Sequence, residues 1–596
     1  MANHILVAVA WPYANADIHV GNIVGAYLPA DIFARYHRLA GNRVLMVSGT
    51  DAHGTPITVR ADAERTSPHD VYLRFHRRFL ELFQRFGLTY DLFTTTHTQN
   101  HFRVAQDIFS ALDANGFLYR QEEAQWYAPA EKRFLPDRYV EGECYICHYP
   151  NARGDQCDNC GNLLDSTRLI SPRARGGGAE LELRPTEHFY LDLARLNPRL
   201  KEYLGRDKEH WRPNVLAPSL HTVESGELRG RAITRDLDWG IPVPVDGWSG
   251  KCLYVWFEAV IGYLSASIEW SANRGQPEAW KDWWYEPEAR TFYFIGKDNI
   301  PFHAVIWPAE LLGTERLYDE RPERRLNLPY DVPANEFLNL EGQKISGSRN
   351  WAVWGLDVLE RYDPDPLRYY LTAVMPETRD SEWEWADFVR RNNDELVATW
   401  GNLANRVLSF THRHFDGIVP DPGSLTDVDR ELLGLVESGF GKVGGFLEAV
   451  RLRDALGEAF ALARAVNVYL ERAPWYSVIA TDRATAARTV YTALRAIDSL
   501  KVLLAPFLPF TSEELQVVFG YDRPLFGEQR LETYHEDDWE HEALIYEPGT
   551  GSGTWAPSRL EPGRRLNPSR PLFRKLEPEV AEAEVQRLRE SSAPQD

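Results

Sequence analysis

The chain has 596 residues and a formal net charge of −21, with 44% apolar and 26% charged residues. Such a length exceeds what one hydrophobic core can organise and predicts about three to five domains. The acidic balance argues against indiscriminate nucleic-acid binding, and the lack of any run of roughly 18 apolar residues excludes a membrane-spanning protein. The first apolar run has no basic region before it, unlike a signal peptide, so we expect a cytoplasmic protein.

Three segments, 5–10, 43–54 and 291–299, contain apolar runs that end in polar residues, and each precedes a helical pattern. Strand–helix alternation with continuous apolar strands predicts a Rossmann-type parallel sheet covered on both faces. Ligands of such sheets lie beyond the carboxyl ends of the strands, so polar residues there are candidates for the site. These candidates are His19, Asp51, His53, Lys297 and Asp298.

The alternation is interrupted between 118 and 229, and long amphipathic helical patterns at 394–410, 458–475 and 484–515 follow later in the chain. These changes in pattern predict an α/β catalytic domain carrying an insertion, followed by an all-α bundle. The expected parts are a catalytic domain in two halves (1–117 and 230–330), an inserted connective domain (118–229), a stem-contact region (331–387), a helical domain (388–520) and a loosely packed tail (521–596).

The first motif in chain order is the loop that follows the apolar run 5–10 and leads into a helix at Gly21. It places His19 above the helix N-terminus, where free N–H groups favour a phosphate. Gly21 would let an adenine ring approach the backbone. A lone histidine near a strand end is also a common structural residue, so this motif needs support from others.

Four of the five cysteines form a Cys-x2-Cys-x9-Cys-x2-Cys pattern, and the fifth, Cys252, stands alone. Two close thiolate pairs can surround one zinc ion, and four protein ligands leave no open position for catalysis. We therefore predict one structural Zn²⁺ in the insertion, with His148 as a bystander. The predicted ligands are Cys144, Cys147, Cys157 and Cys160.

An amphipathic stretch places Trp256, Ala259 and Tyr263 at helical spacing on one face. Aromatic rings beside a small gap suit a thioether, although the same stripe also fits an ordinary core. Further on, a polar loop carries Lys344 beside Ser346, Gly347 and Ser348. Its ammonium could stabilise charge on a triphosphate, or the loop could simply be exposed.

In the helical region, Asn402 and Arg406 share one helical face, and Trp475 follows a proline after a long helix. An exposed tryptophan there could stack on an unpaired base while Asn and Arg read its edge. The alternative is that Trp475 packs between helices.

Taken together, DIHVGN (17–22), KISGS (344–348), the four-cysteine insert, SGTDAHGTPI (48–57) and LYVWFEAVIGYL (253–264) resemble the methionyl-tRNA synthetases, a family of class I aminoacyl-tRNA synthetases. The two short motifs correspond to the family's HIGH and KMSKS motifs, and FIGKDNIPFH (294–303) and RAPW (472–475) also match. The resemblance extends to about residue 535.

The resemblance implies that ATP activates L-methionine to methionyl-adenylate, with Mg²⁺ on the phosphates, before transfer to the terminal adenosine of tRNA(Met), initiator tRNA included. It implies catalytic roles for His19, Asn22 and Lys344, and either a carboxylate-facing or a structural role for Arg235. The ATP site would comprise Gly21, Gly296, Lys297, Asp298, Ser346 and Ser348. The methionine site would comprise Trp11, Tyr13, Asp51, Trp256, Ala259, Tyr263 and His303, and the CAU anticodon would meet Asn402, Arg406 and Trp475.

Two residues depart from the family motifs, since Asn22 replaces a histidine and Gly347 replaces a lysine. We interpret both as variation, because Asn22 can still form hydrogen bonds and Lys344 is present. Two other functions remain open: a class I synthetase for another aliphatic amino acid, and an inert tRNA-binding scaffold. The insertion looks too short for the editing domain of the former. With no C-terminal dimerising module evident, we expect a monomer.

Overall fold

A computed structural model describes residues 3–136, 139–154, 157, 159–160, 164–174, 180–226, 228–319, 321, 324–347 and 349–592. Its centre is a seven-stranded sheet of order β14-β13-β1-β2-β3-β19-β18, in which the first five strands are parallel. The five are β1 (His4–Val9), β2 (Arg43–Thr50), β3 (Leu92–Thr95), β13 (Arg290–Gly296) and β14 (Ala334–Asn335). The predicted parallel α/β fold is thus confirmed.

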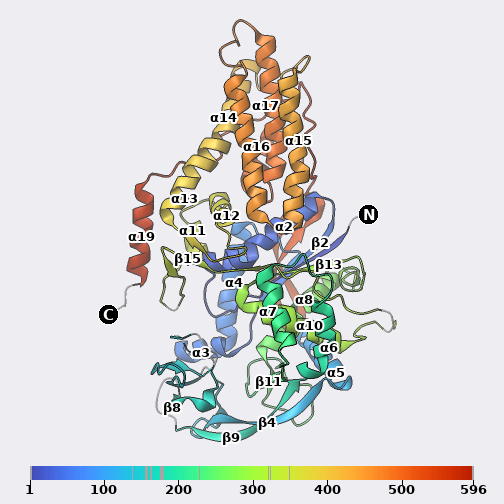
Figure 1. Cartoon of the computed structure of the whole chain (residues 1–596), viewed down its shortest axis with the longest axis vertical. Coiled ribbons are helices and arrows are strands. Elements are labelled where there is room, and N and C mark those ends of the chain that lie inside the picture. Colours follow the sequence, from blue (N-terminus) through green and yellow to red (C-terminus); the bar gives the residue numbers. More distant parts are fainter. Residues whose placement is uncertain are drawn as a thin grey trace.

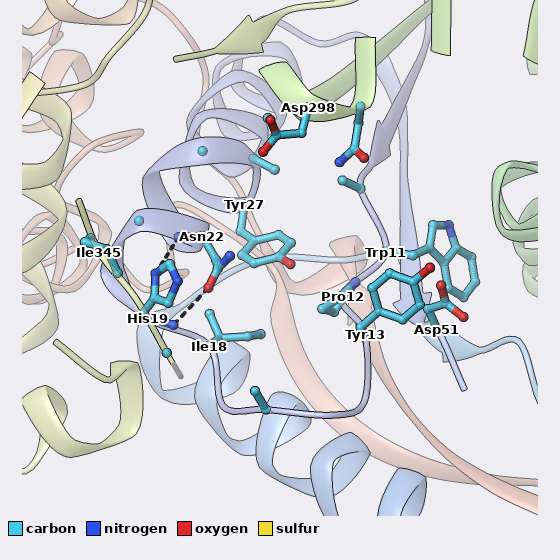
Figure 2. Close-up of a pocket in the computed structure, with 18 of the residues that line it drawn as sticks. Trp11, Pro12, Tyr13, Ile18, His19, Asn22, Tyr27, Asp51, Asp298 and Ile345 are labelled. Atoms are coloured by element: carbon cyan, nitrogen blue, oxygen red, sulfur yellow. Dashed lines mark hydrogen bonds between the residues drawn. The ribbon is translucent and has the colours of Figure 1, made fainter. Parts of the chain in front are cut away.

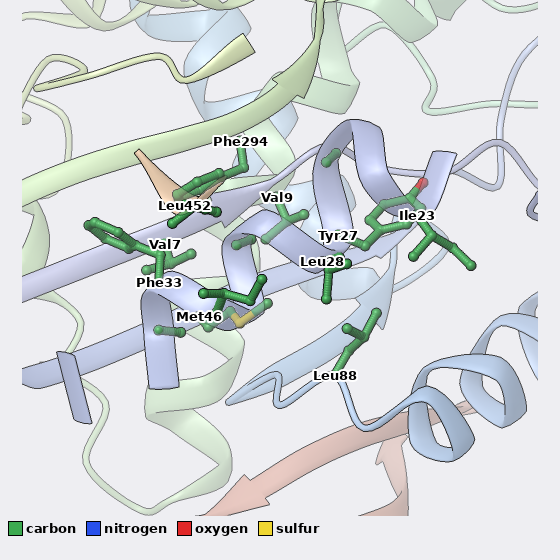
Figure 3. Close-up of a cluster of buried hydrophobic side chains, with 14 of the residues drawn as sticks. Val7, Val9, Ile23, Tyr27, Leu28, Phe33, Met46, Leu88, Phe294 and Leu452 are labelled. Carbon is green, nitrogen blue, oxygen red and sulfur yellow. The ribbon is translucent and has the colours of Figure 1, made fainter. Parts of the chain in front are cut away.

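Helices cover this sheet because the strands between them are apolar on both faces. α2 contacts β1 and β2, while α8 contacts β2 and β3. Figure 3 shows part of the resulting core, where Phe33 of α2 and Phe294 of β13 lie in one cluster with Leu452 of the helical bundle. The helices of the catalytic domain are α1 (Val20–Asn22) with its π-helical continuation Ile23–Tyr27, α2 (Leu28–Leu39), α3 (Thr55–Glu64), α4 (Pro68–Phe86), α5 (Gln99–Ala114), α8 (Val255–Asn273), α9 (Lys281–Trp284) and α10 (Trp307–Thr314), the last preceded by a π-helical turn Phe302–Ile306.

The C-terminal part corrects one expectation of a loosely packed tail over 521–596, because the described residues 521–592 of this segment pack on the body of the protein. The hairpin β18 (Glu528–Glu536) and β19 (Trp539–Glu547) joins the catalytic sheet, and β19 pairs antiparallel with β3. Without the hairpin, β3 would be an edge strand with unpaired backbone groups. The hairpin pairs with these groups and covers this edge. The described part of the chain then ends in helix α19 (Glu579–Ser592), drawn in red in Figure 1.

The interrupting segment forms its own sheet, of order β10-β9-β4-β5, and a small three-stranded sheet around the cysteines. Both lie at the end of the molecule opposite the helical bundle (Figure 1). The elements are β4 (Leu118–Ala128), β5 (Arg133–Phe134), β6 (Val140–Glu143), β7 (Ala152–Arg153), β8 (Ile170–Ala174), β9 (Glu182–Leu191), β10 (Arg231–Ala232), α6 (Leu193–Leu204) and α7 (Pro213–Glu224), with β11 (Thr234–Arg235) and β12 (Cys252–Leu253) on the return.

After the sheet, a short three-stranded unit leads into the bundle, which forms the upper part of Figure 1. The pattern at 484–515 proves to be two helices, because Pro506 and Pro509 interrupt it. The elements are β15 (Leu338–Leu340), β16 (Gln343–Lys344), β17 (Ser381–Trp383), α11 (Gly355–Leu359), α12 (Pro364–Ala373), α13 (Trp385–Arg391), its π-helical continuation Asn392–Gly401, α14 (Asn402–Phe415), α15 (Asp427–Glu448), α16 (Leu452–Arg472), α17 (Arg483–Leu504) and α18 (Pro509–Val518).

A buried ion pair fastens the bundle to the catalytic domain. Arg368 of α12 lies 2.6 Å from Asp31 of α2, and both side chains are fully buried. Arg368 also donates to the carbonyls of Pro506 and Phe507. Burial alone would raise the pKa of Asp31, but Arg35 and Arg368 lower it to about 2.

Within the described part of the chain, every helix is too short or too polar to cross a membrane.

Candidate active site

The loop between β1 and α1 places His19 at the start of the helix, as the N-cap residue. The backbone N–H of Asn22 donates to His19 Nδ1 at 3.3 Å, and the backbone N–H of His19 donates to Asn22 Oδ1 at 3.1 Å (Figure 2). This reciprocal pair is a capping box that satisfies two helix-end donors. Asn22 therefore has a defined role in holding the histidine. Burial lowers the pKa of His19 to about 4, so the ring is neutral at physiological pH.

Lys344, more than three hundred residues away in sequence, lines the same cavity as His19. The cavity is about 560 Å³ in volume. Lys344 is the last residue of β16, and its exposed ammonium lies 4.8 Å from the centre of the Phe337 ring. Next to it, Ile345 approaches Gly21 so closely that a Cβ there would lie 3.1 Å from Ile345 Cδ1. The two motifs thus meet across one nucleotide-sized space.

Of the remaining residues predicted for ATP, some line the cavity and others do not. Gly21, Gly296 and Asp298 line the cavity. Lys297 instead pairs with Glu336 and Asp380, each at 2.8 Å. Burial would lower the pKa of Lys297, but these two carboxylates raise it, so the lysine is committed to a structural contact.

Ser346, the first of the two predicted serines of the loop, lies apart from this lining. Ser346 pairs through its backbone with Trp351 and is not among the residues that line the cavity. Ser348 lies outside the described residues.

The other end of the cavity is lined by all seven residues predicted for methionine. These are Trp11, Tyr13, Asp51, Trp256, Ala259, Tyr263 and His303. His303 Nδ1 lies 2.9 Å from the carbonyl of Asn299, so Nδ1 carries the proton, and Nε2 accepts from the Tyr263 hydroxyl at 2.7 Å. Burial lowers the pKa of His303 to about 4. This end therefore presents neutral aromatic surface.

The position of Trp11 depends on two glycines. A Cβ at Gly262 of α8 would lie 2.5 Å from Trp11 Cζ2, and a Cβ at Gly49 of β2 would overlap the same indole. Real Cβ atoms do not approach other carbons this closely, so only glycine fits on each side. Trp256 stacks on Phe302 with ring centres 4.2 Å apart. The pocket wall is consequently rigid.

Asp51 is the buried carboxylate of this end, with 2% of its surface exposed. Burial and the nearby Glu258 raise its pKa well above the usual range. Glu258 is itself held between His53 Nδ1 at 2.8 Å and His101 Nε2 at 2.7 Å. A bound ammonium would relieve the cost of ionising Asp51.

The buried trio of Glu258, His53 and His101 was missed as a unit by sequence reasoning. Glu258 lies inside the stretch already singled out, but its partners come from distant segments. Arg235, whose role was left open, packs on the Tyr254 ring at 4.0 Å and donates to the Thr234 carbonyl, outside the cavity lining.

Comparison with known proteins agrees with this geometry. A family model described as tRNA synthetases class I (M) matches residues 5–408, and one described as the anticodon binding domain of methionyl tRNA ligase matches 419–534. A methionine–tRNA ligase of Thermomicrobium roseum is 58% identical over 99% of both chains, and that of Roseiflexus castenholzii is 53% identical over 99% of both. The chain belongs to the methionyl-tRNA synthetase family.

The solved structure of Mycobacterium tuberculosis methionyl-tRNA synthetase bound by methionyl-adenylate shares the fold. It has a TM-score of 0.74 at 23% identity, and the likeness covers 96% of this chain and all of that one. The predicted combination of an α/β catalytic domain and a helical anticodon-binding domain is thus the architecture of the family.

In this family member the four predicted cysteines do converge, since their Sγ atoms all lie within 4.8 Å of one another. Backbone N–H groups of Ile146 and Cys147 donate to Cys144 Sγ at 3.4 and 3.5 Å. A hydrogen bond from Asn159 lowers the pKa of Cys147 to about 6, which favours the thiolate. The donor set fits a four-coordinate metal. His148 pairs instead with Glu143 at 2.7 Å.

At the far end of the bundle, Asn402 and Arg406 are exposed on α14, and Arg406 donates to Asn467 at 2.8 Å. Trp475 differs from the expectation of an exposed base-stacking ring. Only 8% of it is exposed, its indole N–H donates to the Leu470 carbonyl, and it packs 4.7 Å from Phe410. The adjacent Tyr476 is 67% exposed and was missed.

Proposed function

We propose that the protein activates L-methionine with ATP to methionyl-adenylate, releases pyrophosphate, and transfers methionine to the 3′-terminal adenosine of tRNA(Met). The observation that carries this proposal is the single cavity that has His19 and Lys344 at one end and the aromatic pocket around Tyr263 and His303 at the other. One such space would hold ATP and methionine side by side, as formation of a mixed anhydride requires.

The chemistry needs positioning and charge stabilisation and no covalent enzyme intermediate. The methionine carboxylate attacks the α-phosphorus, and the bond to the pyrophosphate oxygen breaks. Because His19 Nδ1 accepts the Asn22 N–H, the proton of the neutral ring sits on Nε2, which can donate to a phosphate oxygen. Lys344 would place its charge on the departing phosphates. Mg²⁺, held by the phosphates themselves, would neutralise part of their charge.

Recognition of methionine combines one charge contact with aromatic packing. Asp51 would bind the substrate ammonium, whose charge would favour the ionised form of this carboxylate against the burial that raises its pKa. The thioether would lie against Trp11, Trp256 and Tyr263, whose ring surfaces suit a polarizable sulfur. The Tyr263–His303 hydrogen bond fixes the wall where the side chain ends.

Several finer assignments belong to the same proposal. The four-cysteine group would hold one structural Zn²⁺, because four thiolates leave no coordination position for substrate. Asn402 and Arg406, which remain exposed, would contact the anticodon, and initiator tRNA would be a substrate as well. We further propose that the protein acts in the cytoplasm as a monomer.

The test is amino-acid-dependent exchange of labelled pyrophosphate into ATP, run with each of the twenty amino acids. We expect exchange with methionine, and His19→Ala should reduce kcat by about 10² to 10³, the cost of one transition-state donor. His535→Ala, an exposed histidine of the hairpin, is the matched control. Exchange with isoleucine or valine instead would point to another synthetase, and no exchange with any amino acid would point to a scaffold.

A further inference from the structure

A buried carboxylate fastens the C-terminal helix α19 beside the loop that follows Lys344. Glu584 is 5% exposed and accepts from Arg361 Nε at 2.7 Å and from the Tyr362 hydroxyl at 2.9 Å. Arg361 and Tyr362 directly follow α11, the helix that begins after the loop. α19 also packs along α13, as Figure 1 shows. The helix is therefore docked at a defined place.

The end of α19 reaches the loop itself through one side chain. Asn350 Nδ2 donates to the carbonyl of Ser591 at 2.8 Å, while Asn350 Oδ1 accepts from Trp354 Nε1 at 2.8 Å. Asn350 has a φ of 52°, in the left-handed region that asparagine tolerates and most other residues avoid. Its backbone N–H donates to the Gly347 carbonyl at 3.1 Å. This asparagine therefore ties the loop to α19 and to Trp354 at once.

Trp354 continues the connection into the active site. It lines the cavity, its backbone pairs antiparallel with that of His19, and the two rings lie 6.0 Å apart. The same indole limits Gly347, where a Cβ would lie 3.3 Å from Trp354 Cη2. The contacts Ser591–Asn350–Trp354–His19 thus join the last helix to one proposed catalytic residue, and Gly347 lies three positions after the other.

We propose that α19 is a positioning element for the activation step, which holds loop residues 344–347 in register with His19 through Asn350 and Glu584. This inference rests on the proposed function, because it concerns the same two groups, His19 and Lys344. Lys344 is exposed at the end of a two-residue strand, so little within its own hairpin fixes its ammonium. An external brace would reduce the range of positions that it samples before ATP binds.

Two variants of the full chain test the brace. Asn350→Asp keeps an acceptor for the Trp354 N–H and tolerates the left-handed backbone, but loses the donor to Ser591. Glu584→Gln keeps the size of the buried side chain but removes its charge. Each should lower kcat of methionine-dependent pyrophosphate exchange about fivefold, the worth of about one hydrogen bond, with KM for methionine unchanged. The double variant should show less than the product of the two effects, because both act through one helix.

Arg570→Ala is the matched control. Arg570 lies in the same C-terminal segment as α19, but it pairs with Glu514 of α18 and not with the loop. It should leave kcat unchanged. If Asn350→Asp and Glu584→Gln lower the melting temperature but leave kcat unchanged, α19 only stabilises the fold and the inference is wrong. An equal effect on KM for methionine would also overturn it, since that indicates general disruption. Absence of exchange in the unsubstituted protein would refute the proposed function itself.

Discussion

The two ends of the cavity are built differently. At the proposed methionine end, Tyr263 and His303 are buried and hydrogen-bonded, and Trp11 is confined between two glycines. At the proposed nucleotide end, Asn22 and Lys344 are exposed. The contrast fits the proposed tasks. Discrimination among apolar side chains requires a rigid wall, whereas charge that develops on phosphates is stabilised by polar groups that ATP can reach from solvent.

The largest effect should come from the proposed nucleotide end. Lys344→Ala removes a cation from the developing charge, and we expect kcat of pyrophosphate exchange to fall about 10² to 10³-fold while KM for methionine stays unchanged. Lys442→Ala, which removes a surface lysine paired with Glu458 on the bundle, should have no effect on either constant. A rise in KM for methionine with kcat intact would erase the distinction between the two ends.

The next effect should come from the rigid end. Gly262→Ala forces the Trp11 indole toward the pocket, and overpacking of about 1–3 kcal/mol should raise KM for methionine about five- to 150-fold. KM for ATP should hardly change. Gly434→Ala, where a Cβ meets open space, serves as the control. If steady-state kinetics give equal changes for both substrates, the pocket is not rigid independently of the nucleotide site.

A smaller effect is expected from Tyr263→Phe, which removes the hydroxyl that donates to His303 Nε2. Loss of one hydrogen bond of about 1 kcal/mol should raise KM for methionine about fivefold. The change should be confined to methionine and absent from KM for ATP, measured in the same exchange assay. An unchanged KM for methionine would mean that the Tyr263–His303 bond does not shape the pocket.

The smallest effect on rate concerns pH. The pKa values of His19 and His303 are lowered from 6.5 to about 4, so both rings stay neutral and should leave kcat flat between about pH 6 and 8. Stability should behave otherwise, because the unfolded chain binds these protons at about 6.5. The free energy of unfolding should be fully present above that pH and fall as pH drops toward 4, by about 1.4 kcal/mol per pH unit for each buried histidine. Denaturant titrations across this range would test the sign.

Three of the five parallel strands of the catalytic sheet, and several of the residues that line the cavity, could be predicted because their signals are local. Apolar runs followed by His19, Asp51 and Asp298 indicated parallel strands with ligands at their carboxyl ends. The pattern of Trp256, Ala259 and Tyr263 likewise indicated one helical face. Tertiary contacts decided the rest: Lys297 is held by two carboxylates, and Trp475 is covered by Phe410. The residues that contact Lys297 and Trp475 are all distant from them in sequence.

Helix α15 shows a different limit. It contains five glycines, which oppose helix formation in isolation, and it was not among the predicted helices. The structure explains two of them: a Cβ at Gly439 would overlap Leu462, and one at Gly444 would lie 3.1 Å from both Trp555 and Tyr36. Close packing, which no local pattern announces, favours glycine there. The capping role of Asn22 was similarly hidden, since its partner is the backbone of His19.

The closing of the sheet by β19 has a consequence for biosynthesis. His76 Nε2 and the Glu542 carbonyl, 466 positions apart, form a 2.7 Å hydrogen bond beside β3. At roughly 5–20 residues per second, a ribosome would need tens of seconds to travel between them. Throughout that interval the nascent sheet presents an uncovered border, so the emerging polypeptide would depend on chaperones, or on β3 docking late, to avoid mispairing with its neighbours.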